Sequence, residues 1–126
     1  MKKIIILIPV YNDWESLDKL LKGINENIKF FKEIEFECLI VNDASTTQPP
    51  KLNKPSNFRS VKLLNMRENK GHARCNAFGI RYVFKNKNFD NLILMDGDGE
   101  DRPEEIKSLV EKIKENPNLS VVAKRI

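Results

Sequence analysis

Several features that would assign this 126-residue chain to other protein classes are missing or scarce. No apolar run approaches the roughly 20 residues that a helix needs to span a bilayer. Lysines before the apolar run at residues 4–7 faintly suggest a signal peptide, but the run is short, Pro9 follows it and no small-residue cleavage site is present. We therefore expect a first strand in a cytoplasmic protein, with peripheral contact at the inner face of a membrane as an alternative.

Cysteine and histidine are scarce as well. Cys38 and Cys75 match no zinc-site spacing and provide no disulfide framework, so both are expected to be buried thiols. The single histidine, His72, has no cysteine or second histidine beside it and is a poor metal candidate. The formal charge is a mild +4 with acids and lysines mixed, which argues against a nucleic-acid-binding surface. A solvated surface explains the lysines best, and anionic substrates or membrane lipids are the lesser alternative.

Apolar runs alternate with amphipathic stretches along the chain. Strands are predicted at residues 3–10, 36–41, 61–64, 92–95 and 119–123, and the first, second and fourth of them are expected to be buried. Helices are expected after the first, third and fourth of these strands. This alternation predicts a Rossmann-like α/β fold, with a mostly parallel sheet and helices on both of its faces. The length fits one domain at residues 1–126.

Residue spacing also predicts which face of each helix is buried. In the first helix, a continuous apolar stripe is expected to be core and not a binding face: Leu17, Leu20, Leu21, Ile24, Ile28 and Phe31. Asn12 and Glu15 fit the spacing of a capping box at the start of this helix. In the second helix, which follows Gly71, the apolar face is expected to consist of Ala73, Ala77, Ile80 and Phe84.

Carboxylates are concentrated directly after the fourth predicted strand, at Asp96, Asp98, Glu100 and Asp101. Such a group repels itself unless a cation lies within it, and hard oxygen ligands suit Mg²⁺ or Mn²⁺. Turn formation and the helix dipole explain Asp101 well, but they explain Asp96 and Asp98 less well. A calcium loop of the EF-hand type is disfavoured, because Pro103 interrupts it and a strand precedes it.

Polar residues at the ends of three predicted strands are expected to converge, because ligands bind beyond the carboxyl ends of strands in open α/β sheets. These residues are Tyr11 and Asp13, Asp43, and Asp96 and Asp98. The helix that follows Gly71 offers free backbone N–H groups to an anion, with Lys70 and Arg74 nearby.

Each of these residues also has an ordinary structural explanation. Asp13 could cap the first helix, Asp43 could cap a turn with Ser45, and Tyr11 could cover the sheet edge. Lys70 and Arg74 could be plain solvated cations.

Four motifs in this order resemble the family 2 glycosyltransferases with the GT-A fold. They are IPVYND at residues 8–13, VNDAS at 41–45, NKGHARCNA at 69–77 and MDGD at 95–98. The segment through Pro103 and Glu104 is similar to the polyprenyl-phosphate, dolichol-phosphate mannose synthase-like branch of that family. Arg102 departs from this branch, since it replaces the first of two prolines that are common there.

The resemblance implies roles for individual residues. Pro9, Tyr11 and Asp13 would contact the base and ribose of a nucleotide, and Val41 and Asp43 would hold the base. Asp96 and Asp98 would form a DxD motif that binds the metal and the sugar diphosphate, with Gly97 between them; Glu100 stands where the branch usually has a metal-contacting Gln. The predicted nucleotide-sugar site is Pro9, Tyr11, Asp13, Val41, Asp43, Lys70, Gly71, Arg74, Asp96, Gly97 and Asp98. The predicted ligands of Mg²⁺ or Mn²⁺ are Asp96, Asp98 and Glu100.

The leading hypothesis is therefore a glycosyltransferase that moves a sugar from a UDP- or GDP-linked donor to a lipid phosphate or a glycan. In that family the acceptor site lies mostly beyond the DxD half, so this chain is expected to be the donor-binding part, and no general base is assigned. The alternatives are a truncated or non-catalytic nucleotide-sugar-binding module and a nucleotidyltransferase. The latter is disfavoured because no Gly-rich phosphate loop follows the first strand.

Overall fold

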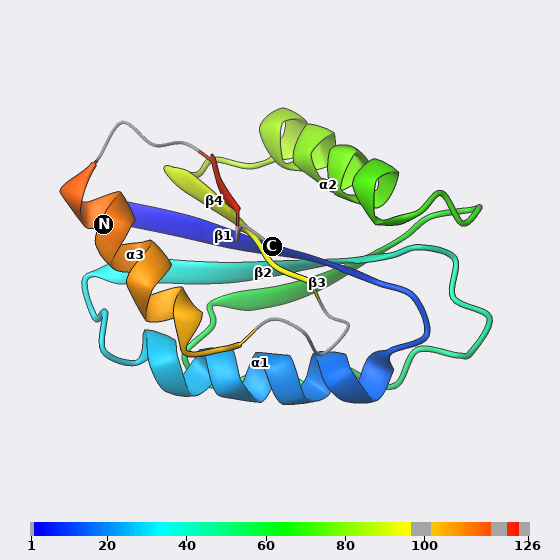
Figure 1. Cartoon of the computed structure of the whole chain (residues 1–126), viewed down its shortest axis with the longest axis horizontal. Helices are drawn as coiled ribbons and strands as arrows, with labels where there is room; N and C mark the ends of the chain where they lie inside the picture. Colours follow the sequence, from blue (N-terminus) through cyan, green and yellow to red (C-terminus); the bar gives the residue numbers. More distant parts are fainter. Residues whose placement is uncertain (1, 97–101, 117–120, 124–126) are drawn as a thin grey trace.

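The computed structural model describes residues 2–96, 102–116 and 121–123, the last three as backbone only. Strands and helices alternate along the chain as the sequence predicts (Figure 1). The elements are β1 (Lys2–Val10), α1 (Trp14–Ile28), β2 (Ile34–Asn42), β3 (Ser60–Asn65), α2 (His72–Asn86), β4 (Asn91–Leu94), α3 (Glu105–Glu115) and β5 (Val121–Ala123).

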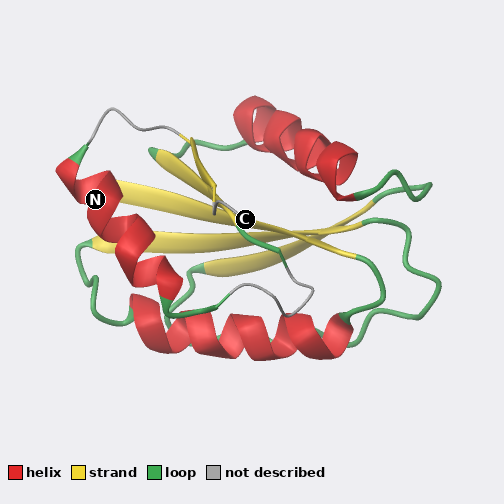
Figure 2. Cartoon of the chain, in the orientation of Figure 1, coloured by secondary structure: helices red, strands yellow, loops and turns green. Residues whose placement is uncertain are grey.

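The sheet has five strands in the order β3-β2-β1-β4-β5, and every neighbouring pair is parallel (Figure 2). The chain builds outward from β1 to β2 and β3, and then returns to place β4 on the other side of β1. The direction in which successive strands are added to the sheet therefore reverses between β1 and β4, although all strands stay parallel. This arrangement confirms the predicted Rossmann-like α/β fold.

Helices cover both faces of the sheet, with α1 and α3 on one face and α2 on the other (Figure 1). Central strand β1 is apolar at nearly every position because both of its faces are buried. Ile4, Ile6 and Ile8 belong to the core beneath α1 and α3. Ile5 and Leu7 belong to the smaller core beneath α2. No helix in the described part of the chain is long and apolar enough to cross a bilayer.

The predicted apolar stripe of α1 is confirmed as core, although Phe31 lies beyond the helix end at Ile28. The predicted capping box at its start is wrong. Residue Asp13 precedes the helix and makes no side-chain capping hydrogen bond. Asn12 adopts a left-handed backbone conformation, with φ of 63°, and its side chain bonds to another loop instead.

The predicted buried face of α2 is also wrong. The residues that face the sheet are Cys75, Gly79 and Val83, whereas Ala73, Ala77 and Phe84 are exposed and Ile80 is half-buried. The reason is the close approach that Gly79 allows. A Cβ atom at position 79 would lie 2.6 Å from Cδ1 of Leu7 and 3.0 Å from Cγ2 of Val41. Apolar spacing alone overlooks a contact face that is made of small residues.

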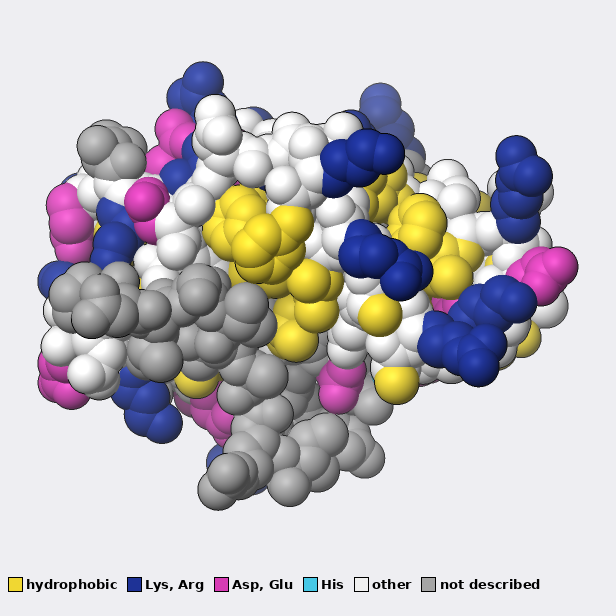
Figure 3. Space-filling view, turned by 90° about the horizontal axis from the view of Figure 1, so that it is seen from above, with side chains coloured by type: hydrophobic (Ala, Val, Ile, Leu, Met, Phe, Trp, Pro, Cys, Tyr) yellow, Lys and Arg dark blue, Asp and Glu magenta, His cyan; other side chains and the backbone are white. Residues whose placement is uncertain are grey.

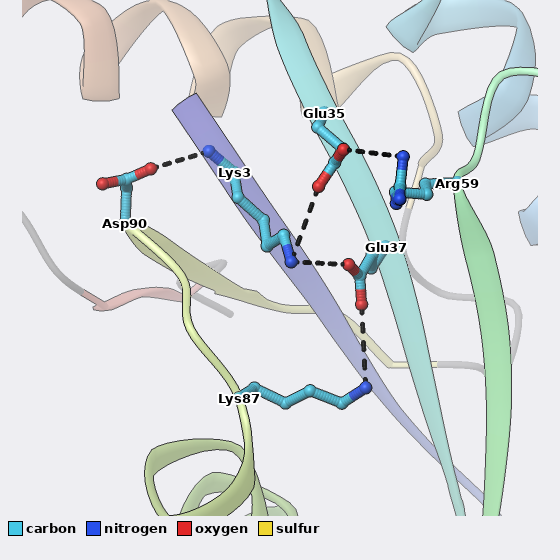
Figure 4. Close-up of polar contacts among 6 residues, drawn as sticks. All are labelled: Lys3, Glu35, Glu37, Arg59, Lys87 and Asp90. Carbon is cyan, nitrogen blue, oxygen red and sulfur yellow. Dashed lines mark hydrogen bonds and ion pairs between the residues drawn. The ribbon is translucent and has the colours of Figure 1, made fainter. Parts of the chain in front are cut away.

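A network of ion pairs, with one hydrogen bond from the Lys3 backbone amide to Asp90, joins the amino-terminal parts of β1 and β2 to neighbouring segments (Figure 4). The Lys3 ammonium lies 2.9 Å from the Glu37 carboxylate, and the Lys87 ammonium lies 3.8 Å from the same group. Burial disfavours the charged form of Glu37, but the hydrogen bond from Lys3 and the two positive charges outweigh it and lower the Glu37 pKa. The network contains Lys3, Glu35, Glu37, Arg59, Lys87 and Asp90.

Leu20→Ala is expected to destabilise the fold by about 2–5 kcal/mol, because its side chain is only 5% exposed within the α1 core and its removal leaves a cavity. The measurement is the free energy of unfolding in denaturant. Lys22→Ala is the matched control on the same helix, since 75% of that side chain is exposed. Equal losses in the two variants would contradict the burial of Leu20.

Glu37→Gln should change how stability depends on pH. Since the fold lowers the Glu37 pKa, its carboxylate stabilises the fold above the ordinary value of 4.5, and this contribution is lost as pH falls below 4.5. The variant should be less stable at neutral pH and lose less stability on acidification than the parent. Glu26→Gln, which removes the same charge from an exposed α1 side chain, serves as the control. Parallel pH profiles for parent and Glu37→Gln would refute this role.

Candidate functional site

Three loops meet at the carboxyl edge of the sheet, where the hydrogen-bond ladder extends past the strands. The Asp43 amide donates to the Val10 carbonyl at 2.8 Å, and the Met66 amide donates to the Asn42 carbonyl at 2.9 Å. The loops after β1, β2 and β3 are thereby held side by side. The structure thus brings the predicted sites at Tyr11, Asp13 and Asp43 to one edge, as parallel strands require.

Asn12 connects the loop after β1 to the loop after β2. Its side-chain Oδ1 accepts the Thr46 amide at 2.9 Å and the Thr47 amide at 3.1 Å, while its own amide donates to Ser45 Oγ at 2.9 Å. Asparagine tolerates the left-handed conformation that this geometry needs. This role is not evident from the sequence, because the spacing of Asn12 to Glu15 favours a helix cap. The side chains on either side, Tyr11 and Asp13, are exposed.

Asp43 holds the start of α2. It is only 1% exposed, and its Oδ1 and Oδ2 accept the backbone amides of Lys70 and Gly71 at 2.8 and 2.9 Å. Gly71 has φ of +84°, a left-handed conformation that glycine adopts without steric cost. The carboxylate therefore fixes the loop from which α2 begins, and its predicted contact with a nucleotide base stays a prediction.

The predicted turn between Asp43 and Ser45 is wrong, because the neighbouring Asn42 makes that contact. Asn42 Oδ1 accepts the Ser45 amide at 3.0 Å, and Asn42 Nδ2 donates to Asn65 Oδ1 at 2.9 Å. In addition, Asn69 Nδ2 donates to the Asp43 carbonyl at 3.2 Å. Three asparagines thus join the loops after β2 and β3. Their only sequence signal was their position directly at or after predicted strand ends.

Both cysteines are buried free thiols, as predicted. Burial, with a smaller contribution from the negative charge of Asp43, raises the pKa of Cys75 to about 12. The Cys75 Sγ lies 3.5 Å from the Val41 carbonyl and donates to it. Burial likewise raises the pKa of Cys38. Neither thiol is ionised near neutral pH, so neither is a nucleophile.

Asp96 lies at the carboxyl end of β4, next to the start of α2. The strand end is fixed by the Met95 amide, which donates to the Leu7 carbonyl at 3.0 Å. Asp96 is half-buried, and its Oδ1 lies 3.8 Å from Nδ1 of His72. The first carboxylate of the predicted metal site thus lies beside the first residue of α2.

The other predicted metal ligands, Asp98 and Glu100, and the intervening Gly97 lie outside the described residues. Within the described ranges, no three His, Cys, Asp or Glu side chains are grouped closely enough to hold a metal ion. The predicted metal site therefore stays a prediction. The chemistry of the three carboxylates fits Mg²⁺ or Mn²⁺, which prefer hard oxygen ligands.

Pro103, which follows the acidic residues in the sequence, packs against α1 at Gly23. A Cβ atom at Gly23 would lie 2.3 Å from Pro103 Cγ, so only glycine leaves room for the proline ring there.

Lys70 and Arg74 line a cavity of about 390 Å³ on the outer side of α2. The rest of its described lining is Met66, Ala77, Phe78 and Arg81. Neither Asp43 nor Asp96 belongs to this lining, and Lys70 pairs with Glu68 at 2.8 Å. None of these contacts tests the predicted contact of Lys70 and Arg74 with a donor phosphate, which stays a prediction.

The predicted site residues Pro9 and Val41 are both buried. They lie opposite one another in the neighbouring strands β1 and β2.

A model of glycosyl transferase family 2 matches residues 5–126. The chain belongs to this family. The sequence motifs, the parallel sheet and the family match agree, and the nucleotidyltransferase alternative is left without support.

Three curated relatives are similar over most of the chain. An undecaprenyl-phosphate 4-deoxy-4-formamido-L-arabinose transferase of Proteus mirabilis is 31% identical, over 87% of this chain and 33% of its own length. An uncharacterised glycosyltransferase of Synechocystis is 30% identical, over 95% and 37%. A dolichol-phosphate mannosyltransferase of Pyrococcus furiosus is 28% identical, over 94% and 32%. The chain thus spans about a third of the length of these relatives.

Asp43→Asn should loosen the loop before α2, because one of the two backbone N–H groups would then face an amide N–H₂. We expect a loss of about 1.5–3 kcal/mol in the free energy of unfolding. Hydrogen exchange at the Lys70 and Gly71 amides should accelerate more than at amides of β1. Asp18→Asn, which changes an exposed α1 side chain, is the control. Unchanged exchange at both amides would show that Asp43 does not hold this loop.

Proposed function

We propose that the carboxyl edge of the sheet binds the nucleotide-diphosphate sugar of a glycosyltransferase reaction. The observation that carries this proposal is the reversal of strand order between β1 and β4. Ligands of open α/β sheets bind outside the carboxyl ends of strands at such a switch point. Tyr11 and Asp13 follow β1, and Asp96 follows β4, so they flank this point. Family membership supports the same reading.

Each side of the switch point would hold a different part of the donor. Exposed Tyr11 and Asp13 are available to the base and ribose. Pro9, Val41 and Asp43 are buried at the ends of β1 and β2, and Asp43 also fixes the Gly71 loop. The backbone N–H groups at the start of α2, with Lys70 and Arg74 close in sequence, would favour the negative diphosphate.

Asp96, Asp98 and Glu100 would hold a divalent cation. When bound, Mg²⁺ or Mn²⁺ would neutralise charge on the departing diphosphate and orient it. Asp96 would present its carboxylate from a fixed strand end, since Met95 is tied to Leu7. Gly97 would allow the backbone to approach the nucleotide closely.

The acceptor that we propose is a polyprenyl phosphate, with a glycan as the alternative. Two of the relatives carry undecaprenyl phosphate and dolichol phosphate in their names. In such a transfer, an acceptor phosphate oxygen bonds to the anomeric carbon, the bond from that carbon to the donor diphosphate breaks, and the nucleoside diphosphate leaves. An ionised phosphate oxygen is already nucleophilic, so no described residue is assigned as a general base. This acceptor would place the domain at the inner, cytoplasmic face of a membrane.

Calorimetric titration of the chain with UDP and with GDP, first with Mn²⁺ and then with EDTA, tests the donor site. We expect metal-dependent binding, and the tighter nucleotide identifies the donor base. Asp96→Asn and Asp98→Asn should each weaken the metal-dependent binding at least ~10-fold, equivalent to about 1.4 kcal/mol. Glu111→Gln, on the exposed surface of α3, should bind as the parent does.

Two outcomes bear on the proposal in different ways. Absence of metal-dependent binding to either nucleotide by a folded sample would overturn the donor site. Donor binding without transfer to a polyprenyl phosphate would support the alternative of a non-catalytic nucleotide-sugar-binding module. Transfer is followed by the appearance of labelled sugar in the lipid phase.

A further inference from the structure

The charges on α2 differ from those on the other two helices. From His72 to Asn86 the helix contains Arg74, Arg81 and Lys85 but no aspartate or glutamate. By contrast, α1 and α3 each mix acidic and basic side chains, and those of α1 pair with one another. A helix that has only cations is suited to an anionic partner.

The three cations lie along one line of the helix surface. Their spacings of seven and four residues bring them to the same side, nearly opposite the buried Val83. All three are exposed, and no carboxylate among the described residues forms an ion pair with them. The line is therefore free to meet a charged surface that comes from outside the described structure.

Apolar side chains flank this line of cations. Phe84 is 57% exposed, and Ala77 beside Arg81 is exposed as well. The Phe84 ring rests edge-on against Phe89, with 5.1 Å between centroids, and this contact holds it at the surface. In Figure 3, which looks onto this side of the molecule, dark-blue cationic side chains lie among yellow apolar ones. We call Arg74, Arg81, Lys85, Ala77 and Phe84 the outer face of α2.

We propose that the outer face of α2 docks on an anionic lipid bilayer. Arg81 and Lys85 would contact lipid phosphates, and Phe84 would enter the boundary between headgroups and acyl chains, as in helices that lie in a membrane interface. Arg74, at the start of the same line, faces the proposed donor diphosphate and adds positive charge near the surface without being needed for the contact. The proposal rests on the proposed function in one respect, namely that a polyprenyl-phosphate acceptor resides in a membrane.

The test measures binding of the whole chain to sedimented vesicles of phosphatidylcholine, with and without ~30% phosphatidylglycerol. We expect binding only to the anionic vesicles, weakening as salt rises, because exposed charges are screened within about 10 Å at 0.1 M salt. Arg81→Glu with Lys85→Glu should lower the affinity at least ~10-fold, since each cation near an anionic surface contributes roughly 5-fold. Phe84→Ser should lower it several-fold.

The matched control variants change residues in or just after α1, on the opposite face of the sheet. Lys19→Glu with Lys22→Glu makes the same change of charge on α1, and Phe30→Ser removes an aromatic side chain that is 60% exposed. Both controls should retain most of the vesicle binding. Equal losses in the α1 and α2 variants would overturn the proposal, because they would show a general effect of net charge. No binding of folded chain to anionic vesicles would overturn it as well.

Failure of this proposal is distinguishable from failure of the donor site. The Arg81→Glu, Lys85→Glu variant should bind UDP or GDP with Mn²⁺ as the parent does, since neither residue belongs to the proposed donor site. If the chain binds vesicles but binds no nucleotide, the result supports the docking proposal and overturns only the donor-site proposal. Equally tight binding to an acidic soluble polypeptide, such as polyglutamate, would favour a protein partner and contradict the bilayer.

Discussion

The buried carboxylate of Asp43 is the interaction on which the carboxyl edge of the sheet depends. It accepts the amides of Lys70 and Gly71, and its own amide extends the ladder from Val10. One residue thereby connects β1, β2 and the start of α2, through its backbone amide and its side chain. A buried carboxylate is costly unless it is hydrogen-bonded, so this edge is held in one arrangement. Asp43 thereby fixes the loop from which α2 begins.

The central position of β1 accounts for much of the remaining architecture. Both faces of β1 are covered, so nearly every residue from Ile4 to Val10 is apolar and polar groups appear only at its ends. One end bears the ion pairs of Lys3 and Glu37, and the other bears Tyr11 and Asp13. The ionic network and the proposed binding site thus lie at opposite ends of one strand. Changes in the ionic network are expected to alter stability without touching the candidate site.

The helices on the two faces of the sheet differ in how they pack against it. Helices α1 and α3 share the larger core, and α1 also leaves room at Gly23 for the proline that follows the acidic segment. On the opposite layer, α2 contacts the sheet through small residues and turns its cations outward. The close approach at Gly79 therefore has a consequence beyond packing: it decides which side of α2 reaches solvent.

The sequence alone determined the order of the elements and the class of the fold, because strands buried on both faces and amphipathic helices have distinct periodicities. The same patterns correctly identified the core stripe of α1 and the buried state of both cysteines. Strand ends were also predictable to within two residues, and so was the edge at which Tyr11, Asp43 and Asp96 meet.

Only the tertiary structure decided how that edge is held together and which way α2 faces. Asn12 has the spacing of a helix cap, but its partners are 34 and 35 residues away, at Thr46 and Thr47. Asp43 has the neighbours of a turn residue, but its partners lie 27 and 28 residues further along. Local spacing favours local partners, whereas parallel strands bring distant loops together. The face of α2 was decided in the same way, since the small Cys75 and Gly79 give no strong apolar signal until the sheet approaches them.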